Sequence, residues 1–250
     1  MMSTRSMGQR DLWPRAPLRR TIAVELLDAR SWDADELRDN LRDIRRVNRL
    51  GGGTSAVLKE LPGLLPAAPP NRRIEVLDLA TGSADIPQAV ARWGQDRGLA
   101  IRVVASDASD EILTVAEERV RGAPDIVLAN YDARAVPLPD QSVDVVLCSL
   151  ALHHFDPPEA VAVLREMNRL ARFGFVVNDL MRCRAGYAVA IGTSRLLTRN
   201  RLTRHDAPLS VLRAYTPAEL RGLFRQAGMQ DVNVRRRPLF RMVAVWKRPA

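Results

Sequence analysis

A chain of 250 residues, 46% of them hydrophobic, can bury one sizeable core but has no room for a second catalytic domain beside it. Its net charge of +9 at pH 7 comes almost entirely from arginines, and these are spread along the chain without one aromatic-interleaved stripe, which argues against nucleic acid as the partner. Genomic base composition alone could produce this arginine content, without any special role. Phosphate binding around residues 195–204 or 235–237 also stays open, as does attraction to an anionic membrane surface that carries a lipophilic substrate.

The cysteines and the apolar runs favour a cytoplasmic protein. Cys148 lies in a predicted core strand and Cys183 in a later segment, so neither a disulfide framework nor a zinc site is expected. The longest apolar runs fall short of the roughly 20 residues that cross a membrane. The first 20 residues carry arginines without a secretory apolar core, and we predict a disordered basic N-terminus over residues 1–20.

A helical arm and a proline-rich linker are predicted over residues 21–70. Asp33 can cap a helix whose apolar positions recur at spacings of three and four until the glycines 51–53 end it. Several prolines between Pro62 and Pro70 then predict the linker. Residues 71–250 are predicted to form a single α/β domain.

The strongest functional signal lies in residues 76–85. Ile74–Leu79 is apolar enough for a central parallel strand and Asp85 begins a helix, so the turn between them lies at the carboxyl edge of a sheet, where ligands bind. The turn lacks the glycines of a dinucleotide loop, and Asp78 would repel a pyrophosphate. Asp78 suits a ligand with a cationic end, such as S-adenosylmethionine; the alternative is a structural aspartate in a tight turn.

Acids also follow the next two predicted strands. Asp107 comes 25 positions after Gly82, close to the roughly 20 expected for a carboxylate that holds two ribose hydroxyls. Asp132, at the end of the third strand, is positioned to accept from an adenine amino group, with Ala133 lining the ring. Each acid alone is more often a cap or turn residue. Three acids at three successive strand ends favour a nucleotide-type cofactor site.

With these motifs the chain resembles the class I S-adenosylmethionine-dependent methyltransferases, over residues 76–85, 106–109, 131–133 and 138–155. The resemblance implies a Rossmann-like α/β fold, with a seven-stranded sheet whose last strand is antiparallel and helices on both faces. It implies S-adenosyl-L-methionine as cofactor and S-adenosyl-L-homocysteine as product. Ala84 stands where the family usually has glycine and is expected to narrow the loop. The predicted cofactor residues are Asp78, Ala80, Gly82, Ser83, Asp107, Ala108, Asp132, Ala133 and Ser149.

Two further resemblances concern the acceptor. Residues 48–54 resemble the N-x-L-x-x-G motif of the ubiquinone and menaquinone methyltransferase branch, in which the arm closes over the cofactor; the alternative is a helix C-cap with extra glycine. Residues 199–206 are similar to methyltransferases that accompany type III polyketide synthases and act on phenolic lipids. This implies O-methylation of a phenolic polyketide or quinol. C-methylation of a quinone precursor, RNA methylation and cofactor binding without catalysis remain the alternatives.

Recognition of a small aromatic or lipophilic acceptor is expected in a helical lid over residues 181–215, because a class I core supplies only the cofactor site. The first half of the lid reads as an amphipathic helix that either roofs an apolar pocket or packs on the core. A capping box then begins the next helix at Thr216 and Pro217.

The histidines supply the candidate general base. Methyl transfer to a phenol needs no metal, and none is predicted. A general base would increase the rate by roughly 10² to 10⁴, because a phenol with a pKa of about 10 is protonated at neutral pH. His153, His154 and His205 are the only histidines. The first two belong to the fold signature, which favours packing roles. His205, beside Asp206 in the predicted lid, is the first candidate, and His154 is held in reserve.

Overall fold

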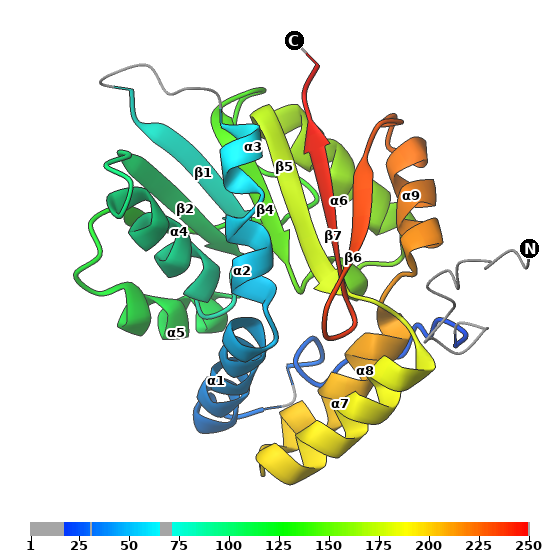
Figure 1. Cartoon of the computed structure of the whole chain (residues 1–250). Helices are drawn as coiled ribbons and strands as arrows, with labels where there is room; N and C mark the ends of the chain where they lie inside the picture. Colours follow the sequence, from blue (N-terminus) through cyan, green and yellow to red (C-terminus); the bar gives the residue numbers. More distant parts are fainter. Residues whose placement is uncertain (1–17, 31, 66–71, 250) are drawn as a thin grey trace, which may run out of the picture.

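The computed structural model describes residues 18–30, 32–65 and 72–249. Its strands and helices alternate through most of this length (Figure 1). Most of the basic N-terminal segment and of the proline-rich linker predicted above lies outside the described residues. No helix in the described part of the chain has the length and apolar character needed to cross a membrane.

Seven strands form one sheet in the order β3-β2-β1-β4-β5-β7-β6. The first five pair in parallel, while β7 runs antiparallel to both β5 and β6. The predicted seven-stranded Rossmann-like sheet is therefore confirmed. The strand order reverses between β1 and β4, which opens a crevice at their carboxyl ends. The strands are β1 (Ile74–Leu79), β2 (Ile101–Asp107), β3 (Ile126–Asn130), β4 (Val143–Ser149), β5 (Ala171–Leu180), β6 (Asn233–Arg237) and β7 (Arg241–Lys247).

Helices cover both faces because successive residues of the central strands point to opposite sides and both sides are apolar. Val76 of β1 belongs to a buried cluster with Val90 and Trp93, whereas Leu77 belongs to one with Leu164 and Phe224. The first face is covered by α2 (Gly53–Leu58), α3 (Leu61–Leu64), α4 (Asp85–Gln95) and α5 (Asp110–Val120), and the second by α6 (Pro157–Leu170) and α9 (Pro217–Gln226).

The helical arm begins as the sequence indicates, with α1 (Ala34–Leu50). One oxygen of Asp33 accepts from the N–H groups of Asp35 and Glu36, and the helix ends at Gly51. The predicted linker, however, does not start at Pro62. That proline lies in the first turn of α3, where its missing N–H costs no helical hydrogen bond.

The predicted lid segment contains two helices, α7 (Arg184–Leu197) and α8 (Arg201–Arg213), which pack together beyond the carboxyl edge of the sheet (Figure 1). Residues 18–30, which we call the N-terminal strap, run beside α8. The N–H groups of Leu26 and Leu27 donate to the two carboxylate oxygens of Asp206, at 2.8 and 3.0 Å. Residues of the strap and of α1, together with Arg213 at the end of α8, lie beside the crevice between β1 and β4.

Candidate active site

A cavity of about 640 Å³ lies at the carboxyl ends of β1 to β4 and extends to α1 and the strap. The structure brings all nine predicted cofactor residues to its wall: Asp78, Ala80, Gly82, Ser83, Asp107, Ala108, Asp132, Ala133 and Ser149. Asn48 of the N-x-L-x-x-G motif also lines this cavity, and its side-chain amide donates to Asp85 at 3.2 Å.

The turn after β1 is built from left-handed residues. Ala80, Gly82 and Ala84 have φ angles of 52°, 54° and 55°, a conformation that costs a residue with a side chain about 1–2 kcal/mol. The side chain of Ala84 is fully buried and packs with Ala91 and Ala105 instead of lining the cavity. The methyl group of Ala84 therefore lies in the core and not in the cavity, and the narrowing of the loop at this position stays a prediction.

Asp78 presents a buried carboxyl group to the cavity. Burial, together with the nearby Asp85 and Asp107, raises its pKa to about 8, although the hydrogen bond from Thr81 Oγ1 (2.7 Å) acts to lower it. Its other oxygen, Oδ1, is buried and has no hydrogen-bond partner among the described residues. An orphaned carboxyl oxygen of this kind fits a ligand that brings a positive charge or an N–H group, as S-adenosylmethionine would.

We expect cofactor binding to release a proton from Asp78. At pH 7 a carboxyl with a pKa near 8 is mostly protonated, and a cationic ligand would lower that pKa. Affinity for S-adenosylmethionine should therefore rise with pH, by at most about tenfold per unit, and level off above pH 8. Calorimetry in two buffers of different ionisation enthalpy counts the released protons. Asp78→Asn is the control, and equal proton release by parent and variant would contradict the assignment.

Asp107 and Asp132 differ in the groups that their carboxylates already bind. Asp107 is 8% exposed, its pKa is raised by burial, and it accepts from the N–H groups of Gly82 (3.1 Å) and Ser109 (3.2 Å). These bonds fix the carboxylate at the end of β2. Asp132 lies at the cavity rim and is engaged by the guanidinium of Arg134 at 2.7 to 3.1 Å, which lowers its pKa. If Asp132 binds an adenine amino group, its carboxylate oxygens would accept from both that group and the Arg134 guanidinium.

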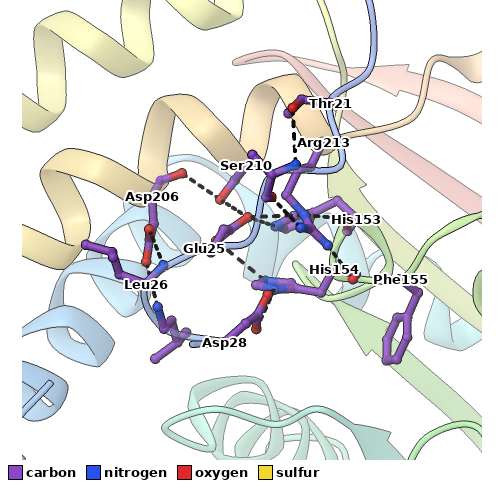
Figure 2. A network of polar contacts seen from close by, with 12 residues as sticks. Thr21, Glu25, Leu26, Asp28, His153, His154, Phe155, Asp206, Ser210 and Arg213 are labelled. Carbon is purple, nitrogen blue, oxygen red and sulfur yellow. Dashed lines mark hydrogen bonds and ion pairs between the residues drawn. The ribbon is translucent and has the colours of Figure 1, made fainter. Parts of the chain in front are cut away.

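His154 is the histidine that lines the cavity. It follows β4 in a short 3₁₀ turn, and its Nδ1 lies 2.8 Å from a carboxylate oxygen of Asp28 in the strap (Figure 2). Its Nε2 lies 3.9 Å from Glu25, also in the strap. Burial lowers the pKa of His154, but Glu25 and Asp28 outweigh it and raise the pKa to about 9.

Arg213, at the end of α8, ties the strap to this turn. Its guanidinium donates to the carbonyls of Ala23 (2.6 Å), His153 (3.2 Å) and His154 (2.5 Å), and Nε lies 3.8 Å from Glu25. Ser210 Oγ donates to Glu25 at 2.9 Å. Figure 2 shows Glu25 at the centre of these contacts, which hold the strap against the core.

Glu25, His153 and His154 place ligand-type atoms within 4.8 Å of one another, a spacing that a metal ion could use. Arg213 nevertheless already supplies a cation beside Glu25. His153 is buried, and its Nδ1 lies 2.7 Å from Asp179. We interpret the cluster as a buried ion-pair network.

His205 is not among the residues that line the cavity. It lies on α8 with its side chain 48% exposed, and its Nδ1 is 2.7 Å from Asp206, the same carboxylate that receives the N–H groups of the strap. The structure thus separates the first candidate base from the cavity and brings the reserve candidate, His154, to it. Sequence reasoning missed Glu25, Asp28 and Arg213, because isolated acids and arginines gave no signal; Asp28 and His154 are 126 positions apart.

Comparisons with known proteins agree with this geometry. A family model described as a methyltransferase domain matches residues 76–174. The demethylmenaquinone methyltransferase of Lysinibacillus sphaericus is 32% identical over 107 residues, which cover 41% of this chain and 42% of the relative. The ubiquinone/menaquinone biosynthesis C-methyltransferase UbiE of Rickettsia bellii is 23% identical over 66% of this chain and 71% of its own length. The chain spans about two fifths of the length of the menaquinone relatives.

The fold is also found among solved structures. A SAM-dependent methyltransferase from Aquifex aeolicus superposes with a TM-score of 0.58 at 20% identity, over 86% of this chain and 97% of that one. This likeness shows a shared fold. With the domain match, it confirms the predicted resemblance to the class I methyltransferases, and the curated relatives confirm the resemblance to the ubiquinone and menaquinone branch.

Proposed function

Because residues 76–174 form a methyltransferase domain of the class I type, we propose that the chain transfers a methyl group from S-adenosylmethionine to a small aromatic acceptor. The acceptor atom we propose is the hydroxyl oxygen of a phenolic polyketide or quinol. The observation that carries this proposal is that one cavity is lined both by the nine predicted cofactor residues and by the pair His154 and Asp28.

S-adenosylmethionine would supply an electrophilic methyl group on a cationic sulfur. Asp78 would bind the positively charged part of the cofactor, and Asp107 would accept hydrogen bonds from the ribose hydroxyls. His154 Nε2 would take the proton of the acceptor hydroxyl, while Asp28 fixes the ring through Nδ1. Leu27 of the strap and Leu41 and Ile44 of α1 line the cavity and would keep water from the reacting atoms. No step requires a metal.

C-methylation of a quinone precursor is the second candidate, because the relative from Rickettsia bellii is named a C-methyltransferase. The same cavity would serve it, with His154 removing a ring hydroxyl proton to activate the adjacent carbon. RNA methylation and cofactor binding without turnover remain alternatives without a supporting observation of this kind. A cytoplasmic location likewise remains a prediction.

Incubation of the full chain with isotope-labelled S-adenosylmethionine tests the proposal directly. A panel of alkylresorcinols, quinols and RNA would be analysed by mass spectrometry. An O-methyl product loses one titratable phenol, whereas a C-methyl product keeps it, so the pH titration of the product separates the two candidates. Tight binding of NAD, or labelling of RNA alone with a steep salt dependence, would contradict the proposed function.

We expect Asp107→Ala to weaken cofactor binding by about 1.5–3 kcal/mol, the size of hydrogen bonds to a charged group, or roughly 10- to 150-fold in Kd. The ribose hydroxyls would lose their acceptor, and the Gly82 N–H would lose its partner. Isothermal titration with S-adenosylhomocysteine measures the loss. Asp110→Ala, three positions on and outside the cavity wall, is the matched control. Equal affinities of the two variants would show that Asp107 does not contact the ribose.

A further inference from the structure

Helix α7 presents apolar side chains to solvent. Val189, Leu196 and Leu197 are 46%, 84% and 76% exposed. Val189 and Leu196 are seven positions apart and therefore share one side of the helix. The opposite side packs on α8, and Figure 1 places α7 at the outer edge of the molecule. A surface helix normally turns its polar side to water. The exposed apolar residues of α7 therefore indicate a surface that binds a partner.

The charged residues of α7 and of the segments that flank it are all basic. Residues 180–205 contain six arginines and no aspartate or glutamate. Two of the six are engaged with acids, Arg182 with Glu219 and Arg201 with Glu36. Arg184, Arg195 and Arg199 are exposed, and within the described ranges no carboxylate lies at ion-pair distance from them. Acids of α1 line a second cavity together with Leu197 and Arg199, but most of them are paired with other arginines: Asp35 with Arg38, Asp39 with Arg42, Asp43 with Arg46 and Glu36 with Arg201. The face therefore combines exposed leucines with arginines that no carboxylate of the described residues pairs.

We propose that this face, which we call the α7 face (Arg184, Val189, Arg195, Leu196, Leu197 and Arg199), docks on an anionic lipid surface. Leu196 and Leu197 enter the headgroup region, and Arg195 and Arg199 meet the lipid phosphates, as on other interfacial amphipathic helices. The proposal names a partner for the proposed function, since a lipophilic acceptor would be reached from the bilayer. The docking itself is independent of turnover.

Other occupants fit the α7 face less well. A second copy of the chain on a twofold axis would bring the same arginines against one another, because such a contact is self-complementary. Single-stranded RNA is usually bound by stacking on aromatic side chains. The single aromatic residue of α7 is Tyr187, which is half-buried. Anionic lipid matches both the charge and the exposed leucines.

Vesicle flotation with the full chain tests the docking. Vesicles of phosphatidylcholine are compared with vesicles that also contain phosphatidylglycerol, and binding is expected to the second kind alone. Each arginine near an anionic surface contributes about fivefold in affinity, so Arg195→Glu with Arg199→Glu should weaken binding by at least about 25-fold. Leu196→Ser with Leu197→Ser should weaken it by about tenfold or more.

Two control variants lie away from α7. Arg225→Glu reverses an exposed charge on α9, and Val127→Ser replaces an exposed apolar residue of β3; both should bind vesicles like the parent. Calorimetry with S-adenosylhomocysteine should give the same affinity for every variant, which separates a failure of docking from a failure of the cofactor site. Equal binding to both vesicle kinds, loss in the controls, dimerisation lost with the leucines, or binding to RNA but not to vesicles would overturn the proposal.

Discussion

Replacing His154 with glutamine is expected to lower the turnover of a phenolic acceptor by roughly 10² or more at pH 9, the range for loss of a general base. Glutamine keeps a polar side chain of similar length but cannot take the proton. Burial disfavours the imidazolium, yet Glu25 and Asp28 hold the pKa of His154 near 9. The parent should therefore gain activity as pH rises toward 9, because His154 acts as a base only after it has lost its proton.

The pH profile distinguishes this role from packing. A bound sulfonium is a like charge for the imidazolium and should lower the pKa of His154, so the apparent pKa of kcat is expected at or below about 9. The His154→Gln variant should lack this limb and gain activity only as the phenol ionises near pH 10. A ratio of parent to variant that does not change with pH would reduce His154 to a packing residue.

His205→Gln is the matched control for this experiment. His205 also pairs with an aspartate through Nδ1, but it lies on α8 away from the cavity wall. Its loss should change turnover by no more than about threefold. A large, pH-dependent effect of His205→Gln would show that His205, the residue favoured by the sequence, is the general base.

The partner of His205 could be predicted from the sequence, whereas the partner of His154 could not. His205 stands next to Asp206 in the chain, and the structure does pair them. Asp206, however, also receives the N–H groups of Leu26 and Leu27. This arrangement ties the strap to α8 and leaves the ring half exposed. The acid that serves His154 comes from the strap, 126 positions earlier. No local pattern encodes such a contact, because it depends on how the strap crosses the finished fold.

The cofactor residues, in contrast, could be predicted because each lies next to its own strand in the sequence. Ile74–Leu79 is buried on both faces and is followed at once by its turn, so one short segment carries both the strand and the ligand-binding residues. Asp107 is again positioned by its own strand, since parallel strands bring their carboxyl ends to one edge. The wrong start of the linker at Pro62 has a local cause: a proline in the first turn of a helix looks the same in sequence as one in a loop.

Arg213→Met is expected to destabilise the protein by about 3–5 kcal/mol, the cost of removing one partner of a buried ion pair. Methionine would replace part of the aliphatic volume but none of the donors. The carbonyls of His153 and His154 and the carboxylate of Glu25 would then lose the guanidinium that faces them. Urea denaturation measures the free energy of unfolding. Arg225→Met on the exposed side of α9 should stay within about 0.5 kcal/mol of the parent.

A double-mutant cycle with Glu25→Gln tests whether the loss arises at the proposed ion pair. Glutamine can still accept from Ser210 Oγ but carries no charge, so removing Arg213 should cost less in its presence. The coupling energy is expected at about 1–3 kcal/mol. Glu25 is also a cause of the raised pKa of His154, so Glu25→Gln alone should shift the rising limb of turnover to lower pH. Additive losses together with an unshifted limb would mean that the strap is held by its backbone contacts alone, and that Glu25 affects neither the fastening of the strap nor the proton on His154.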